Sequence, residues 1–159
     1  MSLLNNLEHP TDARVWRGNL PVYHRYTAGI AGEKFLRALK DEGKLYGTRC
    51  PKCGYVYVPA RIYCERDMTH LDDSTWVQVG PEGELLSFSA VYVDLDGERL
   101  QAPQWVGLVR LQGASGATLH YLGDVQSSAL RAGMKVQAVL KPAKERVGSI
   151  RDIAYFKPV

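Results

Sequence analysis

Four side chains that commonly bind metals lie within one short stretch, CPKCGYVYVPARIYCERD. Cys50 and Cys53 form a C-x2-C pair, and Cys64 and Asp67 repeat that spacing with a carboxylate in place of the second thiol. Two such knuckles, separated by a short hairpin, can direct four ligands at one tetrahedral ion. Gly54, directly after the first pair, permits the sharp turn that a knuckle needs. The spacing predicts a zinc site of three thiolates and one carboxylate.

The fourth ligand has alternatives. His70 could complete the site, with Asp67 hydrogen-bonded outside the coordination sphere. The site could also hold no metal, its cysteines being buried as small hydrophobic residues. A carboxylate suits zinc less well than a thiolate, so a Cys3Asp site should bind zinc more weakly than four cysteines. Catalytic zinc sites keep an open position and are usually rich in histidine and carboxylate, so a metal here would be structural.

Length and composition indicate one ordinary domain or two small ones that share a core, since the chain has 159 residues and 45% are apolar. No apolar run approaches the roughly 20 residues of a membrane span. The N-terminal stretch MSLLNNLEHPTDARVW has no basic segment before a hydrophobic one, so we expect no secretory signal. Three cysteines clustered within 15 residues favour a metal knuckle over disulfides. A cytoplasmic protein with reduced thiols is therefore expected.

Three segments follow one another along the chain. Residues 1–44 are predicted to form an extended segment and then an amphipathic helix over GIAGEKFLRALKDEGKL, with Gly43 as its stop signal. Residues 45–75 form the predicted zinc ribbon. The helix either covers the protein's own core or docks against a partner, because the ribbon beside it offers little core to cover.

Residues 76–159 change to a period of two, and short strands alternate with polar turns such as DLDGERLQAP and GASG. A helical turn, SSAL, falls between the third and fourth long strands. This content predicts a five-stranded OB-fold barrel and favours it over an SH3-like barrel. The expected fold class is therefore mainly β: an N-terminal helix, a rubredoxin-like zinc ribbon and an OB-fold barrel. TWVQV, at the start of the segment, is also read as a strand.

Other catalytic signatures are missing from the sequence: it has no G-x-S-x-G, no P-loop and no G-x-G-x-x-G after a strand. His120, in ATLHYLG, alternates with apolar neighbours and is expected on a strand face. The residues alone therefore indicate a binding module rather than a self-sufficient enzyme.

The combination of these motifs resembles a known family. The stretch EGKLYGTRCPKCG, the proline after the knuckle (Pro59), LSFSAVYVD, APQWVGLVRLQGA, LRAGMKVQAVL and the closing IAYFKPV are similar to small bacterial and archaeal proteins with a rubredoxin-like zinc ribbon and an OB-fold, a former domain of unknown function. The resemblance covers roughly residues 23–159. It assigns Cys50, Cys53 and Cys64 to three zinc positions, and Asp67 departs from the cysteine usual at the fourth.

The resemblance implies a function that composition does not. Members of that family are non-catalytic partners of thiolases and related acyl-CoA enzymes, where they bridge subunits or help to form the CoA-binding channel. Others are joined to hydratase or lipid-transfer-type aldolase partners. By this resemblance the chain is an accessory subunit of an acyl-CoA enzyme, most closely a thiolase, with zinc as its structural metal and a CoA thioester as the substrate bound by the complex.

CoA carries phosphates, an adenine and a long pantetheine arm. Arginine and lysine suit the phosphates, and aromatic and apolar side chains suit the adenine and the arm. A local excess of positive charge over residues 130–157 would also suit a polyphosphate, or form an ordinary solvated strand face. In the alternative interpretation, the tyrosines pack the ribbon against the barrel and contact no ligand. The candidate CoA contacts are Tyr55, Tyr57, Arg61 and Tyr63 on the ribbon, and Lys141, Lys144 and Arg146 near the fourth barrel strand.

Two further functions compete. Zinc ribbons and OB barrels often bind nucleic acid, but residues 81–159 carry nine Lys and Arg against eight Asp and Glu, and their aromatic strands hold a single cation, Arg110. Nucleic acid is therefore the less favoured partner. A free-standing enzyme such as a CoA thioesterase would need a marked nucleophile or carboxylate, and none is visible.

Overall fold

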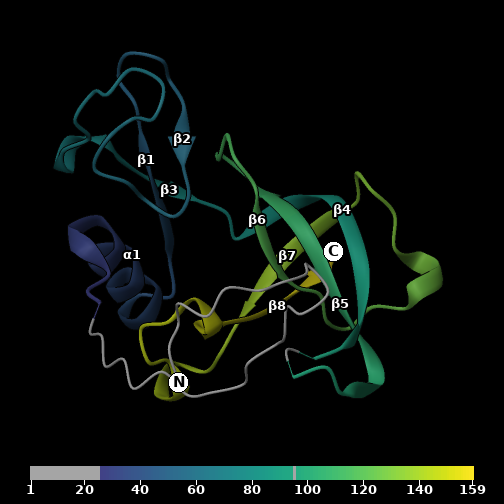
Figure 1. Ribbon diagram of the computed structural model, residues 1–159. Coiled ribbons are helices and arrows are strands. Elements are labelled where there is room, and N and C mark those ends of the chain that lie inside the picture. Colours follow the sequence, from purple (N-terminus) through teal and green to yellow (C-terminus); the bar gives the residue numbers. More distant parts are fainter. Residues whose placement is uncertain (1–25, 95) are drawn as a thin grey trace, which may run out of the picture.

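The computed structural model of the protein describes residues 26–94 and 96–159, which form a helix, a small sheet and a larger sheet (Figure 1). The extended segment expected before the helix falls mostly in residues 1–25, outside this range. None of the helices described has the length and apolar character to span a bilayer. The elements are α1 (Gly29–Asp41), β1 (Leu45–Arg49), β2 (Val56–Tyr57), η2 (Asp73–Thr75), β3 (Trp76–Val79), β4 (Glu82–Val93), β5 (Arg99–Leu111), β6 (Thr118–Tyr121), η3 (Ser127–Ala129), β7 (Lys135–Leu140), η4 (Ala143–Glu145), η5 (Ile150–Asp152) and β8 (Ile153–Pro158).

The amphipathic helix forms where the sequence predicts it, and its apolar face covers the protein's own core. Phe35 and Leu39 are 2% and 0% exposed. They belong to one hydrophobic cluster that also contains Leu45 of β1 and Phe156 of β8. This shared core supplies the surface that the ribbon alone lacks, so the buried face of the helix is not available to a partner. Ile30, in the first turn, remains 80% exposed.

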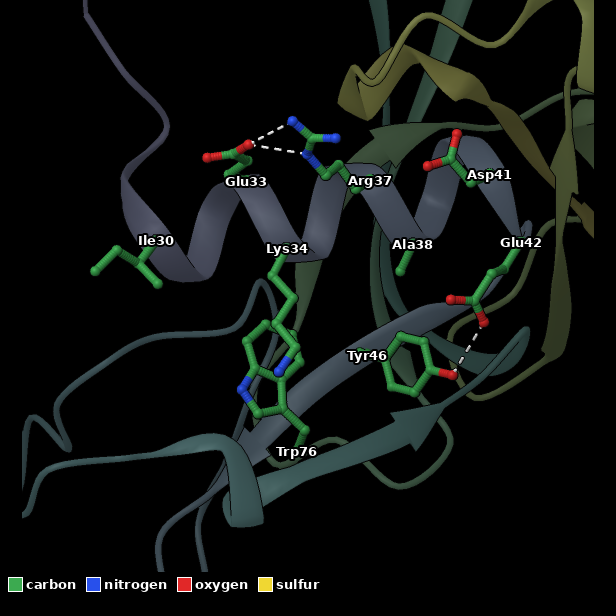
Figure 2. Close-up of a pocket in the computed structure, with 9 residues that line it drawn as sticks. All are labelled: Ile30, Glu33, Lys34, Arg37, Ala38, Asp41, Glu42, Tyr46 and Trp76. Carbon is green, nitrogen blue, oxygen red and sulfur yellow. Dashed lines mark hydrogen bonds and ion pairs between the residues drawn. The ribbon is translucent and has the colours of Figure 1, made fainter.

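The outer side of α1 faces the small sheet across a shallow hollow of about 600 Å³ (Figure 2). The Lys34 ammonium lies 4.5 Å from the centre of the Trp76 ring and forms a 2.7 Å ion pair with Asp73. Glu33 and Arg37 pair with each other one turn apart, at 2.7 Å. The contacts of Lys34 across the hollow hold the helix against the ribbon. Because Lys34, Glu33 and Arg37 already have partners, the hollow offers little free charge to a ligand.

The small sheet has the strand order β2-β1-β3. The sequence places TWVQV with the barrel strands, but β3 pairs with β1 in an antiparallel ladder running from Leu45↔Val79 to Thr48↔Trp76. The division into residues 1–44, 45–75 and 76–159 stays a prediction.

The large sheet contains five antiparallel strands in the order β6-β5-β4-β7-β8, which confirms the OB-like content. As expected, η3 lies between β6 and β7, the third and fourth strands of this sheet along the chain. The expected closed barrel needs correction. The sheet's two edge strands, β6 and β8, are connected by an isolated parallel bridge, Leu122↔Phe156. Since β6 ends at Tyr121, one residue before that bridge, no ladder among the described strands closes the sheet.

The first two strands of this sheet are longer than the sequence predicts. The sequence pattern predicts a turn over the whole of DLDGERLQAP, but β5 begins at Arg99. Pro103 is tolerated because proline is accepted on strand edges and at bulges. The β4–β5 register shifts between Val91 and Val93, beside this position. The result is a long hairpin that extends beyond the other strands.

His120 lies on a strand face, as expected, and is 9% exposed. Its Nδ1 accepts a 2.9 Å hydrogen bond from the Tyr121 N–H, which leaves the proton on Nε2 to be donated to the Ile150 carbonyl oxygen at 3.3 Å. Burial lowers the pKa of His120 despite these backbone contacts. The neutral ring is therefore the form that the fold accommodates.

Acidification should therefore destabilise the protein through His120. An unfolded histidine has a pKa of about 6.5, so the unfolded chain binds more protons below that pH. This contribution is complete above about pH 6.5 and is lost as the pH falls below it. In urea denaturation, His120→Asn, which keeps an acceptor near the Nδ1 position, should flatten the pH dependence of the unfolding free energy between about pH 5 and 7. Equal slopes for both proteins would contradict this assignment.

Candidate metal centre

The first knuckle is a tight turn closed by backbone hydrogen bonds. The Gly54 N–H donates to the Cys50 carbonyl oxygen at 2.9 Å, and the Cys50 N–H donates to the Tyr55 carbonyl oxygen at 2.9 Å. Gly54 has a φ of 73°, the left-handed conformation that glycine adopts without steric cost. The Cys53 N–H points at the Cys50 sulfur, 3.5 Å away.

The second knuckle repeats these bonds position by position. The Met68 N–H donates to the Cys64 carbonyl oxygen and the Cys64 N–H to the Thr69 carbonyl oxygen, both at 2.9 Å. Met68 thus occupies the place of Gly54 and also has a positive φ, 58°. Asp67 occupies the place of Cys53. Comparing the two knuckles residue by residue in the sequence would have shown that Met68 stands where a glycine is favoured.

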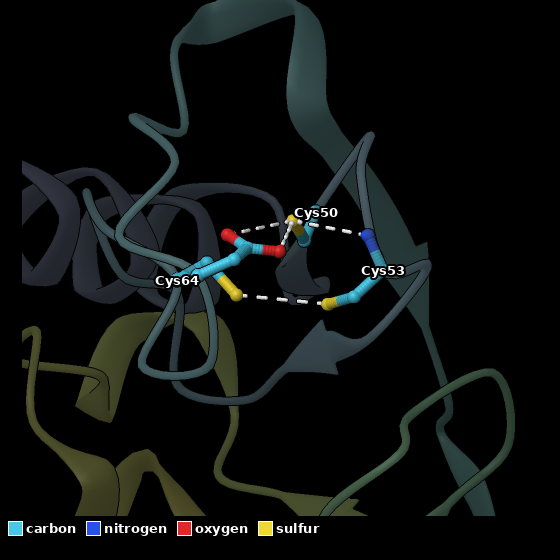
Figure 3. A group of neighbouring side chains, drawn as sticks. Cys50, Cys53 and Cys64 are labelled. Atoms are coloured by element: carbon cyan, nitrogen blue, oxygen red, sulfur yellow. Dashed lines mark hydrogen bonds between the residues drawn. The ribbon is translucent and has the colours of Figure 1, made fainter.

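The four candidate ligands converge (Figure 3 labels the three cysteines). One ligand atom from each of Cys50, Cys53, Cys64 and Asp67 lies within 4.8 Å of the others. The Cys53 and Cys64 sulfurs are 3.6 Å apart, and the Cys50 sulfur is 3.4 and 3.6 Å from the two carboxylate oxygens of Asp67. Tetrahedral zinc, with bonds of about 2.3 Å to sulfur and 2.0–2.2 Å to oxygen, requires ligand separations of about 3.5–3.8 Å. The donor set therefore fits zinc.

Asp67, and not His70, belongs to this cluster. The Thr69 N–H donates to Asp67 Oδ1 at 3.0 Å and fixes the carboxylate toward the sulfurs. His70 instead forms a bridge with Tyr63, and the two rings lie 5.2 Å apart. Since a ligand must be deprotonated to bind a metal, the hydrogen bonds from Thr69 matter further: they hold the pKa of Asp67 well below its usual range.

Tyr57 contacts the same cluster through its hydroxyl, a role that the sequence did not reveal. Its side chain is 5% exposed, and its hydroxyl lies 3.3 Å from the Cys64 sulfur while accepting a hydrogen bond from the Glu65 N–H at 3.1 Å. This arrangement leaves the hydroxyl proton for Cys64. Although burial opposes it, the contact lowers the pKa of Cys64, and it raises the pKa of Tyr57 to about 12.

The remaining ribbon candidates for CoA contact surround this centre. The Tyr55 ring packs 4.7 Å from that of Tyr57 and lies under the Arg66 guanidinium at 4.3 Å. Arg61 forms an ion pair with Glu65. Tyr63 is 49% exposed. Arg61 and Tyr63 line a hollow whose other wall is the N-terminal turn of α1.

The basic candidates lie at the other end of that helix. Arg146 donates from Nε to the Lys141 carbonyl oxygen at 2.8 Å and from Nη1 to the Lys40 carbonyl oxygen at 3.5 Å. Lys144 belongs to the adjacent turn η4. Because α1 has 13 residues, its ends are about 20 Å apart. No hydrogen bond, ion pair or ring contact in residues 26–94 and 96–159 links the two groups, and CoA binding by either stays a prediction.

The fold and this cluster define a class of protein: a zinc ribbon joined to an OB-like sheet. Two family models match, the rubredoxin-like zinc ribbon domain of ChsH2 over residues 37–67 and its C-terminal OB-fold domain over residues 76–141. A DUF35 domain-containing scaffold protein of Methanocaldococcus jannaschii is 30% identical over 128 residues, which cover 77% of this chain and 87% of that protein. The chain belongs to the DUF35 family.

Further relatives agree. A DUF35 domain-containing scaffold protein of Methanothermobacter thermautotrophicus is 27% identical over 127 residues, covering 77% of this chain and 92% of its own. The crystal structure of a DUF35-family protein of unknown function from Sulfolobus solfataricus matches with a TM-score of 0.61 and 27% identity over 82% of this chain and 87% of that one. A chain of the Ltp2-ChsH2(DUF35) aldolase has the same fold, with a TM-score of 0.60 at 18% identity, over 84% of this chain and 98% of that one.

Purified protein should contain about one zinc ion per chain. Asp67→Cys should bind zinc more tightly, because a thiolate suits zinc better than a carboxylate. Asp67→Ala should bind it at least about tenfold more weakly, since even the loss of an outer hydrogen-bonding partner costs that much. Competition with a chromophoric chelator measures all three affinities, and His70→Ala is the matched control. A large loss in that control, with none in Asp67→Ala, would contradict the ligand assignment.

Met68→Gly should stabilise the zinc-loaded protein. A left-handed conformation costs a non-glycine residue roughly 1–2 kcal/mol, which glycine avoids. Glycine also raises the entropy of the unfolded chain, which offsets about 0.4–1 kcal/mol of that gain in stability. Met68 is 73% exposed, so little packing is lost. A net gain of about 0.5–1 kcal/mol is expected in chemical denaturation. Gly54→Ala, the reverse change at the corresponding position of the first knuckle, should destabilise the protein. A loss of stability in Met68→Gly would refute the claim that Met68 stands where glycine is favoured.

Proposed function

We propose that the protein is a non-catalytic accessory subunit of an acyl-CoA enzyme complex, with a thiolase-like enzyme as its partner. The observation that carries the proposal is the closed cluster of Cys50, Cys53, Cys64 and Asp67. All four positions of a tetrahedral ion are taken by the protein, so a metal there supports the fold and leaves no position for a substrate. Two scaffold proteins of the same family, at 30% and 27% identity, support a structural role.

In this proposal the partner completes the CoA-binding channel. Arg61 and Tyr63 line a hollow at the N-terminal turn of α1. Lys141 and Lys144 lie near its C-terminal end, where Arg146 contacts the Lys141 and Lys40 carbonyl oxygens. Neither group encloses a ligand alone. The lysine ammonium groups suit the phosphates of CoA, and the exposed Tyr63 ring suits its adenine. A partner surface laid along α1 could join the two groups into one channel.

Nucleic acid remains the weaker candidate. Arg110, which lies on β5 with Trp105, forms a 2.6 Å ion pair with Glu84 and is already neutralised. The tip of the long hairpin carries Asp94, Asp96 and Glu98, which would repel a phosphate backbone.

Co-expression with a thiolase-like enzyme from the same organism should yield a complex that survives size-exclusion chromatography. The enzyme's thiolysis of acyl-CoA should depend on this protein, while the protein alone should turn over no acyl-CoA. A variant with Lys141 and Lys144 both changed to Gln should raise the KM for acyl-CoA without dissociating the complex. Separate elution, together with thiolase activity indifferent to this protein, would refute the proposal.

A further inference from the structure

The long hairpin has a distal half that no other part of the sheet supports. β7 pairs with β4 only over Glu82–Glu84, and β6 pairs with β5 only over Val106–Val109. Beyond these ladders, residues 88–93 and 99–104, named here the hairpin arm, have ladder partners only within the β4–β5 hairpin itself. Within the described residues, no backbone hydrogen bond from another element reaches the arm. Both of its backbone edges are therefore free.

The arm is apolar although it stands in solvent. Every residue in it is exposed except Ala90 and Gln104, which are half-buried. Its one charged residue is Arg99. The exposed hydrophobic side chains are Phe88, Val91, Tyr92, Val93 and Leu100, between 37% and 62% exposed. Two-stranded ribbons are marginal in water by themselves, and proteins usually protect free edges with charged residues or proline. Pro103 blunts the β5 edge, but the β4 edge carries neither.

Apolar side chains lie on both faces of the arm. Val91 and Val93 both point to a face that lines a groove, and Tyr92, 62% exposed, does not line it. That face forms one wall of the groove, whose volume is about 810 Å³ and whose opposite wall includes Leu119 and Ile150. A strand that is apolar on both faces is typical of sheets covered on both sides. The arm therefore has the composition of a buried element and the exposure of a surface one.

Charge decides between the occupants that could cover it. The tip carries Asp94, Asp96 and Glu98 beside a single Arg99. If two copies of the chain paired along β4 in antiparallel fashion, each acidic tip would approach the start of the other copy's β4. Glu82 and Glu84 there, with Arg110 and Lys135 beside them, offer the tip no net positive charge. Parallel pairing would bring the two tips together. Like charges that face each other across strands are destabilising, so a second copy is disfavoured.

We propose that the hairpin arm is the element by which this protein docks onto its enzyme partner. The partner surface would present an apolar stripe or free strand edge to residues 88–93, and lysine or arginine side chains to the acidic tip. Apolar side chains of the partner would enter the groove beside Val91 and Leu119. This inference rests on the proposed function and names the surface that serves it, which none of the predicted CoA contacts does.

The test uses the full chain and the co-expressed thiolase-like enzyme. Tyr92→Asp should raise the dissociation constant at least about 30-fold, the size of an interface hot spot. Val147→Asp, at a residue 72% exposed in the loop between η4 and η5, is the matched control and should change it less than about threefold. Asp96→Asn combined with Glu98→Gln should slow association and weaken its salt dependence, with little effect on dissociation. Asp94 is left intact because its Oδ1 accepts hydrogen bonds from the N–H groups of Asp96 and Glu98.

Hydrogen exchange on the wild-type proteins gives a readout that needs no variant. Amides of residues 88–93 should exchange quickly in the free protein and become protected in the complex. A complex that forms without this protection, and that Tyr92→Asp leaves intact, would overturn the docking inference and spare the proposed function. Failure of the wild-type chain to bind the enzyme would overturn both. A dimer of the chain alone that Tyr92→Asp dissociates would assign the arm to a second copy instead.

Discussion

Convergence of the two knuckles on one tetrahedral centre is the constraint on which the rest of the ribbon depends. The small cluster around it buries Cys50, Tyr57, Cys64 and Leu71, too few side chains to order a loop of this length. A metal ion held by these four ligands would supply what packing does not. Because the site does not exist in the unfolded chain, the free energy of metal binding becomes folding free energy. With the knuckles fixed, the hairpin between them has one path, and β2 lies where it can reach the large sheet.

Contacts between β2 and the loop after β5 join the two sheets. The Val56 N–H donates to Ser115 Oγ at 3.0 Å, and the Ser115 N–H donates to the Val56 carbonyl oxygen at 3.1 Å. Val56 and Phe35 share a hydrophobic cluster with Leu85 and Phe156 of the large sheet. Helix, ribbon and sheet therefore hold one another through a common core. The hairpin arm extends beyond that core.

Local patterns in the sequence predicted the helix, the knuckles, the five sheet strands and the turn η3. They failed where the outcome depends on neighbours distant in the chain. Pro103 reads as the end of a turn, and nothing local reveals that the edge it occupies has no partner strand. Barrel closure depends on how far β6 runs beside β8, which strand periodicity does not encode. Tyr57 looked like a ligand contact because its spacing alone cannot show that its hydroxyl meets Cys64.

The four protein ligands would leave a bound cation no open position, so the metal centre would be structural and not catalytic. X-ray absorption at the zinc edge of freshly purified protein tests that claim most directly. The account predicts one zinc per chain with three sulfur neighbours at about 2.3 Å and one oxygen at about 2.0–2.2 Å. A coordination shell containing histidine nitrogen or exchangeable water, or a folded protein without zinc, would contradict it.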